Sequence, residues 1–412
     1  MNTPKIRFKG FKDDWEQRKL EDISQITAGG TPSTKELTYW EPKEVPWLAS
    51  GEVHKKYIYD TDEMISEEGL NNSSAKWVEE GSVLIALAGQ GKTRGTVAIT
   101  RIPVTTNQSI AAIKFNDILD ADYAFHNLDS RYDELRNISS GDGTRGGLNK
   151  QLLADLTIAF PQICEQREIG EYFTNLDHLI TLHQRKCDET KELKKFMLQK
   201  MFPKNGEKNP EIRFEGFTDD WEQRKVLDLL VQPVTDGPHE TPRLVENGIP
   251  FISVDAIVDN KIDFSRKRGD VSEEYDAECC KKYKPQYHDV YVVKSGSTVG
   301  KVAIVETTDR FNIWSPLAAL RCEGKTKPYY LFYLLQTRRM QAQILDKASN
   351  GTQPNLSMRE LEKFDVLVTD NAEEQQRIGD YFKSLDHLIT LHQRKCEKLK
   401  ELKKFMLQNM FV

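Results

Sequence analysis

One segment of twelve residues occurs twice in this 412-residue chain, letter for letter. LDHLITLHQRKC fills positions 176–187 and again 385–396. A hydrophobic core accepts many interchangeable apolar residues, so packing alone does not demand such fidelity. The identity indicates a surface that the chain uses twice. A repeat of this kind constrains the architecture of the whole chain.

The repetition extends along the whole chain. DDWEQRK at 13–19 returns at 219–225, and KELKKFMLQ at 191–199 returns at 400–408. The stretches between these near-identical segments have diverged while keeping a common plan. The resulting divisions are an N-terminal arm (1–20), a first variable domain (21–160), a first helical spacer (161–205), a second arm (206–226), a second variable domain (227–371) and a second helical spacer (372–412).

The two spacers have the pattern of long amphipathic helices. In the first, apolar positions recur at a seven-residue period and no proline interrupts the segment before Pro203. At about 1.5 Å per residue, such a helix is roughly 55–60 Å long. The predicted stripe joins one set (Ile169, Leu176, His183, Thr190, Met197) to a second (Tyr172, Leu179, Lys186, Leu193), widened by Phe173, Ile180, Cys187 and Met201.

The variable stretches have a different pattern. Runs such as VLIALAG (83–89) and DVYVVKSG (289–296) are short, β-rich and bounded by glycine or polar residues, which is typical of strands and tight turns. Segments 121–138 and 327–345 add a helix to each. We expect an α+β protein of two copies related by a pseudo-twofold axis. Each copy has an α/β variable domain with a curved, mostly antiparallel sheet and one long helix, and the two helices pair as an antiparallel coiled coil.

Such an arrangement presents the repeated surfaces twice in the same geometry, which suits two copies of one partner. The diverged domains are then free to hold two different ligands.

Composition sets looser bounds. The formal charge is −6 and the isoelectric point is near 5.9, which argues mildly against nucleic-acid binding, although an acidic chain can carry a basic face. No apolar run is long enough for a membrane span, and the first residues lack the apolar core of a signal peptide. We expect a cytoplasmic protein without membrane contact. The six cysteines lack zinc-like spacing and are interpreted as reduced thiols.

The sequence carries no recognisable catalytic motif. GQGKTRG at 89–95 resembles a phosphate loop, but the required first glycine is Ala86, and the second copy has SGSTVGK there. We interpret both as turns between strands. A methyltransferase cofactor loop, a spaced nuclease metal set and a histidine paired with a nucleophile are also missing, so we expect no enzyme activity and no bound cofactor or metal in this chain.

The whole chain resembles the specificity subunit of type I restriction-modification systems. The resemblance rests on the order of arm, variable domain and helix, found twice. Four stretches also carry it: AGGTPST (28–34), YWEPKEVPWLASGEV (39–53), SSGDGTRGGLNKQLLADLTIAFPQICEQREI (139–169) and SNGTQPNLSMRELEKFDVLV (349–368).

The resemblance implies a non-catalytic adaptor. Each variable domain would be a target-recognition domain that reads one half of a bipartite site in double-stranded DNA, and the helical pair would set the spacer. The constant regions would bind two modification subunits, which methylate adenine with S-adenosylmethionine, and two restriction subunits that use ATP and Mg²⁺ would join them. Two readers on one face of DNA should lie about 34–36 Å apart, which a helix pair of this length can span.

Candidate DNA-binding residues are polar and basic side chains in or beside the glycine-rich loops, since bases and phosphates are bound by such groups. In the first domain they are Gln90, Lys92, Thr93, Arg94, Arg145, Asn149 and Lys150. In the second they are Lys294, Ser297, Thr298, Lys301, Asn350, Gln353, Asn355 and Arg359, with Arg266, Lys267 and Arg268 as a phosphate clamp.

Several alternatives stay open. Any single candidate could instead be a solvated loop charge or a helix cap. Lys191, Lys194 and Lys195, repeated at 400, 403 and 404, could be a wet helix face or could meet DNA or a partner. The alternative function is a coiled-coil structural adaptor that binds proteins, not DNA, through its variable domains. The aromatic pairs Trp15/Trp221 and Phe8/Phe214 are expected to anchor the arms on the helices.

Overall fold

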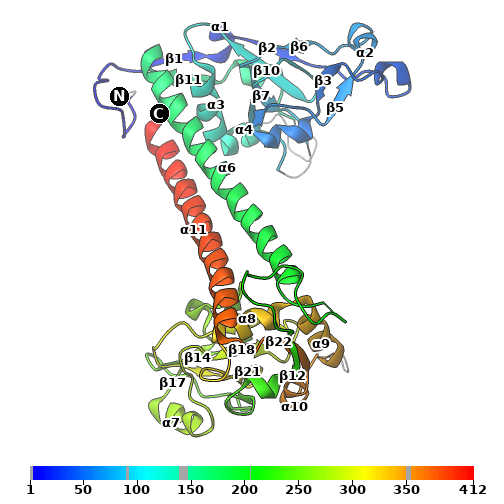
Figure 1. Cartoon of the computed structure of the whole chain (residues 1–412). Coiled ribbons are helices and arrows are strands. Elements are labelled where there is room, and N and C mark those ends of the chain that lie inside the picture. Colours follow the sequence, from blue (N-terminus) through cyan, green and yellow to red (C-terminus); the bar gives the residue numbers. More distant parts are fainter. Residues whose placement is uncertain (1–2, 90–91, 139–146, 205, 349–353) are drawn as a thin grey trace. The chain divides into compact units, whose positions relative to one another are not determined.

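The protein forms two compact units, each of which combines one variable domain with parts of both long helices (Figure 1). The structure is a computed structural model, and it describes residues 3–89, 92–138, 147–204, 206–348 and 354–412. Unit 1 contains Met1–Gln184 and Arg394–Val412, and unit 2 contains Arg185–Gln393. The long helices α6 (Ile163–Lys200) and α11 (Ala372–Met410) therefore each contribute to both units.

Unit 1 contains a five-stranded sheet in the order β2-β10-β7-β8-β4, a four-stranded sheet β5-β3-β9-β6 and the ribbon β1-β11. Among the strand pairs that the structure describes here, β3–β9 and β4–β8 are parallel and the others are antiparallel. The strands are β1 (Glu16–Lys19), β2 (Ser24–Ala28), β3 (Val45–Leu48), β4 (Tyr57–Ile58), β5 (Glu63–Ile65), β6 (Trp77–Val78), β7 (Val83–Ala86), β8 (Val97–Thr100), β9 (Val104–Thr106), β10 (Ile110–Phe115) and β11 (Thr157–Phe160). The shorter helices are α1 (Leu20–Ile23), α2 (Glu67–Asn71), α3 (Ala121–Ser130), α4 (Tyr132–Asn137) and α5 (Lys150–Ala154).

Unit 2 repeats this plan with shorter sheets, β13-β21-β18-β19 and β17-β14-β20, and the ribbons β12-β22 and β15-β16. Only β14–β20 is parallel among these strand pairs of the described residues. The strands are β12 (Glu222–Lys225), β13 (Thr235–Asp236), β14 (Ile249–Ile252), β15 (Ile257–Val258), β16 (Lys261–Ile262), β17 (Gly269–Val271), β18 (Val290–Val293), β19 (Val302–Ile304), β20 (Asn312–Ile313), β21 (Leu317–Leu320) and β22 (Asp365–Val368). The shorter helices are α7 (Glu273–Lys282), α8 (Pro328–Gln336), α9 (Arg338–Ala348) and α10 (Met358–Glu362). The mixed, mostly antiparallel α+β fold is as predicted.

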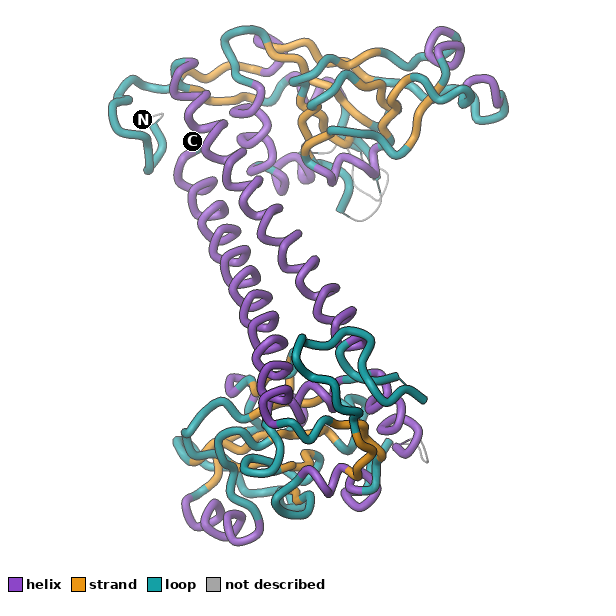
Figure 2. The backbone as a smooth tube through the Cα atoms, in the orientation of Figure 1, coloured by secondary structure: helices purple, strands orange, loops and turns teal. Residues whose placement is uncertain are grey.

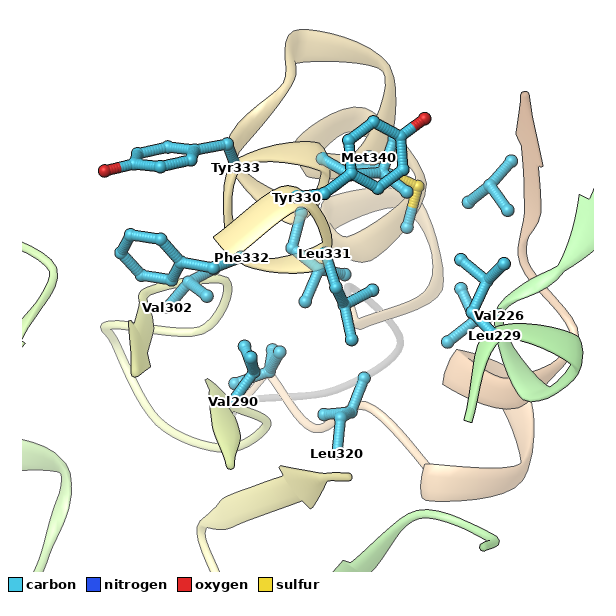
Figure 3. Close-up of a cluster of buried hydrophobic side chains, with 14 of the residues drawn as sticks. Val226, Leu229, Val290, Val302, Leu320, Tyr330, Leu331, Phe332, Tyr333 and Met340 are labelled. Carbon is cyan, nitrogen blue, oxygen red and sulfur yellow. The ribbon is translucent and has the colours of Figure 1, made fainter. Parts of the chain in front are cut away.

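The central strands β7 and β18 are apolar on both faces because each lies between two clusters. In β18, Val290 and Val292 belong to the cluster that includes α8, whereas Tyr291 and Val293 belong to a second cluster on the other face. This alternation follows from the two-residue period of a strand. Figure 3 shows α8 and α9 packed over the first face, through Tyr330, Leu331, Phe332 and Met340 against Val290, Val302 and Leu320.

Each variable domain is held to its long helix by a close backbone approach. A Cβ at Gly170 of α6 would lie 2.9 Å from the backbone nitrogen of Tyr123 in α3. At the repeated position, a Cβ at Gly379 of α11 would lie 3.0 Å from Tyr329 Cβ in α8. A side chain at Gly170 would force the backbone of α3 to shift, and one at Gly379 would need its neighbour to move by a few tenths of an ångström, so both crossings favour glycine. Because Tyr123 and Tyr330 both meet this glycine, α3 and α8 are equivalent helices in the two units.

The two long helices pack antiparallel within unit 1. The rings of Phe173 and Phe411 stack with centroids 5.5 Å apart. Further along α6, Asp177 Oδ2 lies 2.5 Å from Lys403 Nζ, and the Sγ of Cys396 lies 3.9 Å from the carbonyl oxygen of Ile180. Partner numbers fall along α11 as they rise along α6, which defines the antiparallel direction.

Unit 2 repeats these contacts with the roles of the helices exchanged. Asp386 Oδ1 lies 2.7 Å from Lys194 Nζ, and Cys187 Sγ lies 4.0 Å from the carbonyl oxygen of Ile389. The aspartate and the cysteine both belong to the repeated dodecamer. Part of the duplication is therefore used inside the protein, where the same interhelical contacts form twice. In each unit the paired segments are helical, and Figure 2 draws them as purple tubes.

The predicted heptad stripe is only partly correct. Ile169, Phe173, Leu176 and Cys187 are buried as expected. Leu179 and Leu193, assigned to the second set of the stripe, are instead 40% and 44% exposed, and Lys186 is exposed. Each helix end packs against the other helix on one side and a variable domain on another, so the buried face follows these two neighbours and leaves the Leu179 side open.

The arms are anchored by aromatic and ionic contacts. The phenylalanines pack on the long helices as predicted, whereas the tryptophans contact tyrosines of α3 and α8 in the variable domains. Phe8 packs edge-on against Tyr172 at 5.8 Å, and Trp15 is buried beside Tyr123. Unit 2 repeats both contacts. Beside them, Arg7 forms a two-pronged pair with Glu165 at 2.6 and 2.7 Å, and Arg213 does so with Glu374 at 2.7 and 2.9 Å. Both glutamate side chains are fully buried in the first turn of their long helix.

Candidate nucleic-acid and partner interfaces

The first candidate segment in each domain is a hairpin loop. Lys92, Thr93 and Arg94 lie between the antiparallel strands β7 and β8, and the loop closes where Gly95 (φ +82°) donates to the carbonyl of Ala86 at 2.9 Å. In unit 2 the loop between β18 and β19 closes in the same way, from Gly300 (φ +92°) to Val293 at 2.9 Å. A phosphate loop joins a strand to a helix, so a loop between two strands does not match that motif.

The second candidate segment lies beside the hairpin in both units. In unit 1 the backbone nitrogen of Leu148 donates to Leu87 at 3.2 Å, which brings Asn149 and Lys150 to the loop. In unit 2, Leu356 donates to Lys294 at 2.7 Å, and Asn355 forms a β-bridge with Ser295. The exposed residues Ser297 and Lys301, with half-buried Thr298, lie in the neighbouring hairpin, and Arg359 is exposed on α10. The segments proposed from sequence thus converge twice.

A third segment reaches the same edge. It consists of the loop 107–109 together with residues 29–31, which contact it, and it was not among the candidates. In unit 1 the hydroxyl of Thr31 donates to Gln108 Oε1 at 2.6 Å, and Ser109 accepts a backbone bond from Leu87 at 2.8 Å. A Cβ at Gly29 would lie 1.9 Å from the carbonyl oxygen of Thr106. The paired glycines of AGGTPST could have signalled this approach. We call the edge formed by these three segments (92–95, 148–150, and 107–109 with 29–31) the rim of unit 1, and the equivalent edge the rim of unit 2.

The rim of unit 2 is held by equivalent backbone hydrogen bonds, but it carries different side chains. Ser315 donates to the carbonyl of Pro238 at 3.1 Å, and Lys294 donates its backbone N–H to Pro316 at 2.8 Å. The guanidinium of Arg268 lies 4.0 Å from the ring centroid of Trp314, directly before Ser315. The equivalent loop of unit 1 carries Asn107 and Gln108. The two rims therefore offer different chemistry on one frame.

Internal partners occupy some candidate side chains. Lys294 is buried, with its Nζ 3.2 Å from Asp236 Oδ2. Lys267 pairs with Asp270 at 2.6 Å, and Arg266 lies 3.4 Å from Asp263. Asn149 caps α5, since its Oδ1 accepts from the backbone of Leu152 at 2.9 Å. Gln90, Arg145, Asn350 and Gln353 lie outside the described residues.

A buried ionic network joins the helices to the variable domain in unit 1. Asp177 accepts from the hydroxyl of Tyr57 at 3.0 Å and from Lys403 at 2.5 Å. Burial and then the charge of Lys56 lower the pKa of Lys403, while Asp177 acts in the opposite direction. His126 lies in the same network, 4.0 Å from Asp177. Burial lowers its pKa well below the usual value, and the charges of three nearby cations, Lys403 first, add to this.

Both helices keep an exposed apolar face, which we call the leucine face. Leu179, Leu193 and Phe196 of α6 are between 40% and 50% exposed. Their repeat equivalents on α11, Leu388, Leu402 and Phe405, are between 42% and 53% exposed. Large apolar side chains therefore recur in both copies with about the same exposure.

No helix among the described residues has the length and apolar character needed to cross a membrane.

Comparison with known proteins gives consistent results. The sequence profile described as "Type I restriction modification DNA specificity domain" matches residues 12–192 and 219–401. Over 379 residues the chain is 24% identical to the type I restriction enzyme MjaIX specificity subunit of Methanocaldococcus jannaschii, covering 86% of this chain and 83% of that protein. It is 23% identical over 416 residues to the MjaVIII specificity subunit of the same organism, covering 95% and 91%.

The fold is also similar to a solved structure. The S subunit of a type I restriction-modification system from M. genitalium superposes with a TM-score of 0.68, covering 100% of this chain and 99% of that one. The sequence identity is 14%, so this likeness concerns the fold alone.

Proposed function

Because the chain belongs to the family of type I restriction-modification DNA specificity domains, which it matches twice, we propose that it is the non-catalytic subunit that selects the DNA site of a methyltransferase complex. In this proposal the rim of unit 1 reads one half of a bipartite site in double-stranded DNA, and the rim of unit 2 reads the other. The paired helices set the spacer between the halves. The protein works in the cytoplasm, where the DNA is.

The observation that carries this proposal is the pair of rims. Three segments converge in each unit with the same backbone bonds, yet the side chains differ: Thr31 and Gln108 in unit 1, and Arg268 beside Trp314 in unit 2. Base edges are read by amide, hydroxyl and guanidinium groups presented in a fixed geometry. One frame with two side-chain sets suits a protein that reads two unlike half-sites.

Mapping of methylated adenine tests this function. The full chain is expressed with its modification subunit, and the genome is sequenced for N6-methyladenine. Replacing residues 21–160 by the equivalent domain of a relative should change one half of the methylated motif and leave the other half and the spacer unchanged. Replacing 227–371 should change only the other half. A motif that is unaltered by both replacements contradicts the proposal.

The leucine face is the proposed docking site for two modification subunits, which carry S-adenosylmethionine. Its occurrence on both helices, with Phe196 and Phe405 about equally exposed, supports a partner that binds twice. Restriction subunits, which use ATP and Mg²⁺, would then join as a second pair.

The mass of the assembled complex gives the number of modification subunits bound per chain and so tests this docking. Leu193→Glu with Phe196→Glu places charge on one copy of the leucine face and should reduce the modification subunits bound per chain from two to one. Leu402→Glu with Phe405→Glu is the matched variant for the other copy, and combining all four changes should abolish binding. A two-to-one complex that survives the four changes excludes this face as the docking site.

A further inference from the structure

Unit 2 contains a hollow of about 490 Å³ between the end of α6 and the variable domain, which we call the basic hollow. It is formed by α6, the turn after β15, the hairpin loop before β19, and the α8–α9 junction. Among the described residues that line it there are five cationic side chains and no carboxylate; the cations are Lys191, Lys194, Lys195, Lys301 and Arg338.

Unit 1 has the repeat-related hollow, of about 630 Å³, where the end of α11 meets its variable domain. Its lining also has five cationic side chains, of which Lys400, Lys403 and Lys404 are the repeats of the three α6 lysines. Three carboxylates accompany them, namely Asp129, Asp133 and Asp177. The repeated lysines therefore line a hollow with three carboxylates in unit 1, which we call the mixed-charge hollow, and a hollow with none among its described lining residues in unit 2.

One of these carboxylates, Asp129, has a neutral residue at its equivalent position in unit 2, whereas the counterpart of Asp177 is Asp386, which is kept and pairs with Lys194. In unit 1, Lys56 Nζ pairs with Asp129 Oδ2 at 2.6 Å. The equivalent contact in unit 2 is neutral, since Asn260 donates its side-chain amide to Gln336 Oε1 at 3.1 Å. The geometry of the pair is kept while both charges are gone.

A second ion pair of unit 1, whose two residues are not among those lining its hollow, also has no equivalent in the described part of unit 2. Arg131 of unit 1 pairs with Glu134 at 2.6 Å. In the equivalent helix of unit 2 these positions are Arg338 and Gln341, and the Gln341 amide donates to the carbonyls of Gly300 and Leu335 at 2.9 and 2.8 Å. Arg338 thus keeps its charge without the carboxylate that its counterpart has.

Three of the five cations have no carboxylate partner in the part of the chain that the structure describes. Lys194 is paired with Asp386, and Lys195 lies 3.7 Å from Glu192. No ion pair is formed by Lys191, Lys301 or Arg338; Lys301 reaches only the carbonyl oxygen of Ile257, at 3.4 Å. Like charges gathered in a hollow repel one another, and an anion bound among them removes that repulsion.

We propose that the basic hollow is a phosphate-binding site that holds the backbone of the DNA beside the half-site read by unit 2. This inference rests on the proposed function. Lysine ammonium groups and an arginine fork are the side chains that bind phosphate oxygens best. The site adds affinity without base preference, because phosphate contacts carry no sequence information.

The salt dependence of DNA binding tests the site, since each phosphate contact changes the slope of log K against log [salt] by about 0.9. The full chain is titrated by fluorescence anisotropy with a labelled duplex of random sequence over a series of NaCl concentrations. Lys191→Gln with Lys195→Gln should reduce the magnitude of the slope by about 0.9 to 1.8. The matched control, Lys400→Gln with Lys404→Gln, changes the repeated lysines of the mixed-charge hollow, where carboxylates compete with phosphate, and should leave the slope at the wild-type value.

The outcomes separate this inference from the proposed function. Wild-type protein without salt-dependent DNA binding overturns both. Wild-type binding with equal slopes in all three proteins, or an equal loss in both variants, overturns the phosphate site alone. Equal urea unfolding midpoints establish that the variants are folded.

A second arm distinguishes DNA from free polyphosphate. Thermal unfolding is measured with tripolyphosphate and no DNA. Stabilisation of the wild type that Lys191→Gln with Lys195→Gln abolishes, together with an unchanged DNA slope, assigns the hollow to a free phosphate compound and overturns the DNA assignment.

Discussion

Units 1 and 2 share a frame and differ in what the frame presents. Both are assembled from an arm arginine on a buried glutamate, a glycine crossing and an interhelical aspartate–lysine pair. The rims and the two hollows differ in side chains and charge. Positions at which both units use the same residue type either hold the frame together or present one surface twice. Positions at which one unit has changed its chemistry are the candidates for binding that differs between the units.

The largest expected effect concerns the shared frame. Arg7→Ala leaves the carboxylate of Glu165 buried without its partner, which costs about 3–5 kcal/mol in the free energy of unfolding. Arg213→Ala should cost about the same through Glu374. Urea unfolding measures both, with Arg18→Ala as the control, because its pair with Glu16 is exposed and should change stability by less than about 0.5 kcal/mol. A small loss for Arg7→Ala and a large one for Arg213→Ala would break the equivalence of the two units.

A second effect distinguishes the units by pH. His126 in unit 1 is equivalent to Tyr333 in unit 2, and only the histidine titrates in mild acid. The folded state lowers the pKa of His126 well below 6.5, so the unfolded chain binds a proton first as the pH falls. The contribution of His126 to stability is therefore complete above about pH 6.5 and is lost below it, at up to about 1.4 kcal/mol per pH unit.

His126→Phe should flatten the decline of unfolding free energy between pH 7.5 and 5.5, measured by urea denaturation. Its neighbours in the fold include Thr174, Asp177 and Lys403, and they remain in place in this variant. An unchanged pH profile would assign the acid sensitivity to other groups.

The smallest expected effect on the free energy of unfolding compares an asparagine that caps a helix with one that does not. Asn149→Ala removes the side-chain bond to Leu152 that caps α5 and should cost about 1 kcal/mol. Asn355, in the corresponding segment of unit 2, caps no helix through its side chain in the described structure, so Asn355→Ala should change stability by less than about 0.5 kcal/mol. If Asn355→Ala is as costly, the two segments play the same structural role.

Sequence alone predicted the repeat, the two long helices and the mostly antiparallel domains, because each produces a periodic or duplicated signal. It assigned Leu179 and Leu193 to the buried stripe, where the structure leaves them exposed. A seven-residue period shows that a helix has an apolar stripe, but it does not show which neighbour covers each part of that stripe. Here the other long helix and a variable domain each cover part of the stripe, and neither covers the side with Leu179 and Leu193.

The rim was predictable only in part. The glycine-rich loops marked two of its three segments, since such loops are recognisable in a single sequence. The approach of Thr31 to Gln108 depends on strands distant in sequence, which only the fold brings together. The replacement of Asp129 and Glu134 by Gln336 and Gln341 was also not visible, because the variable domains align reliably only after their helices are superposed on the glycine crossing.

Each unit is completed by a helix end that belongs to the other copy of the sequence. Because KELKKFMLQ is the same at both ends, either end suits either unit. A new variable domain acquired by recombination would therefore meet a helix surface that already fits it, and the protein can exchange what it binds without rebuilding how it is assembled.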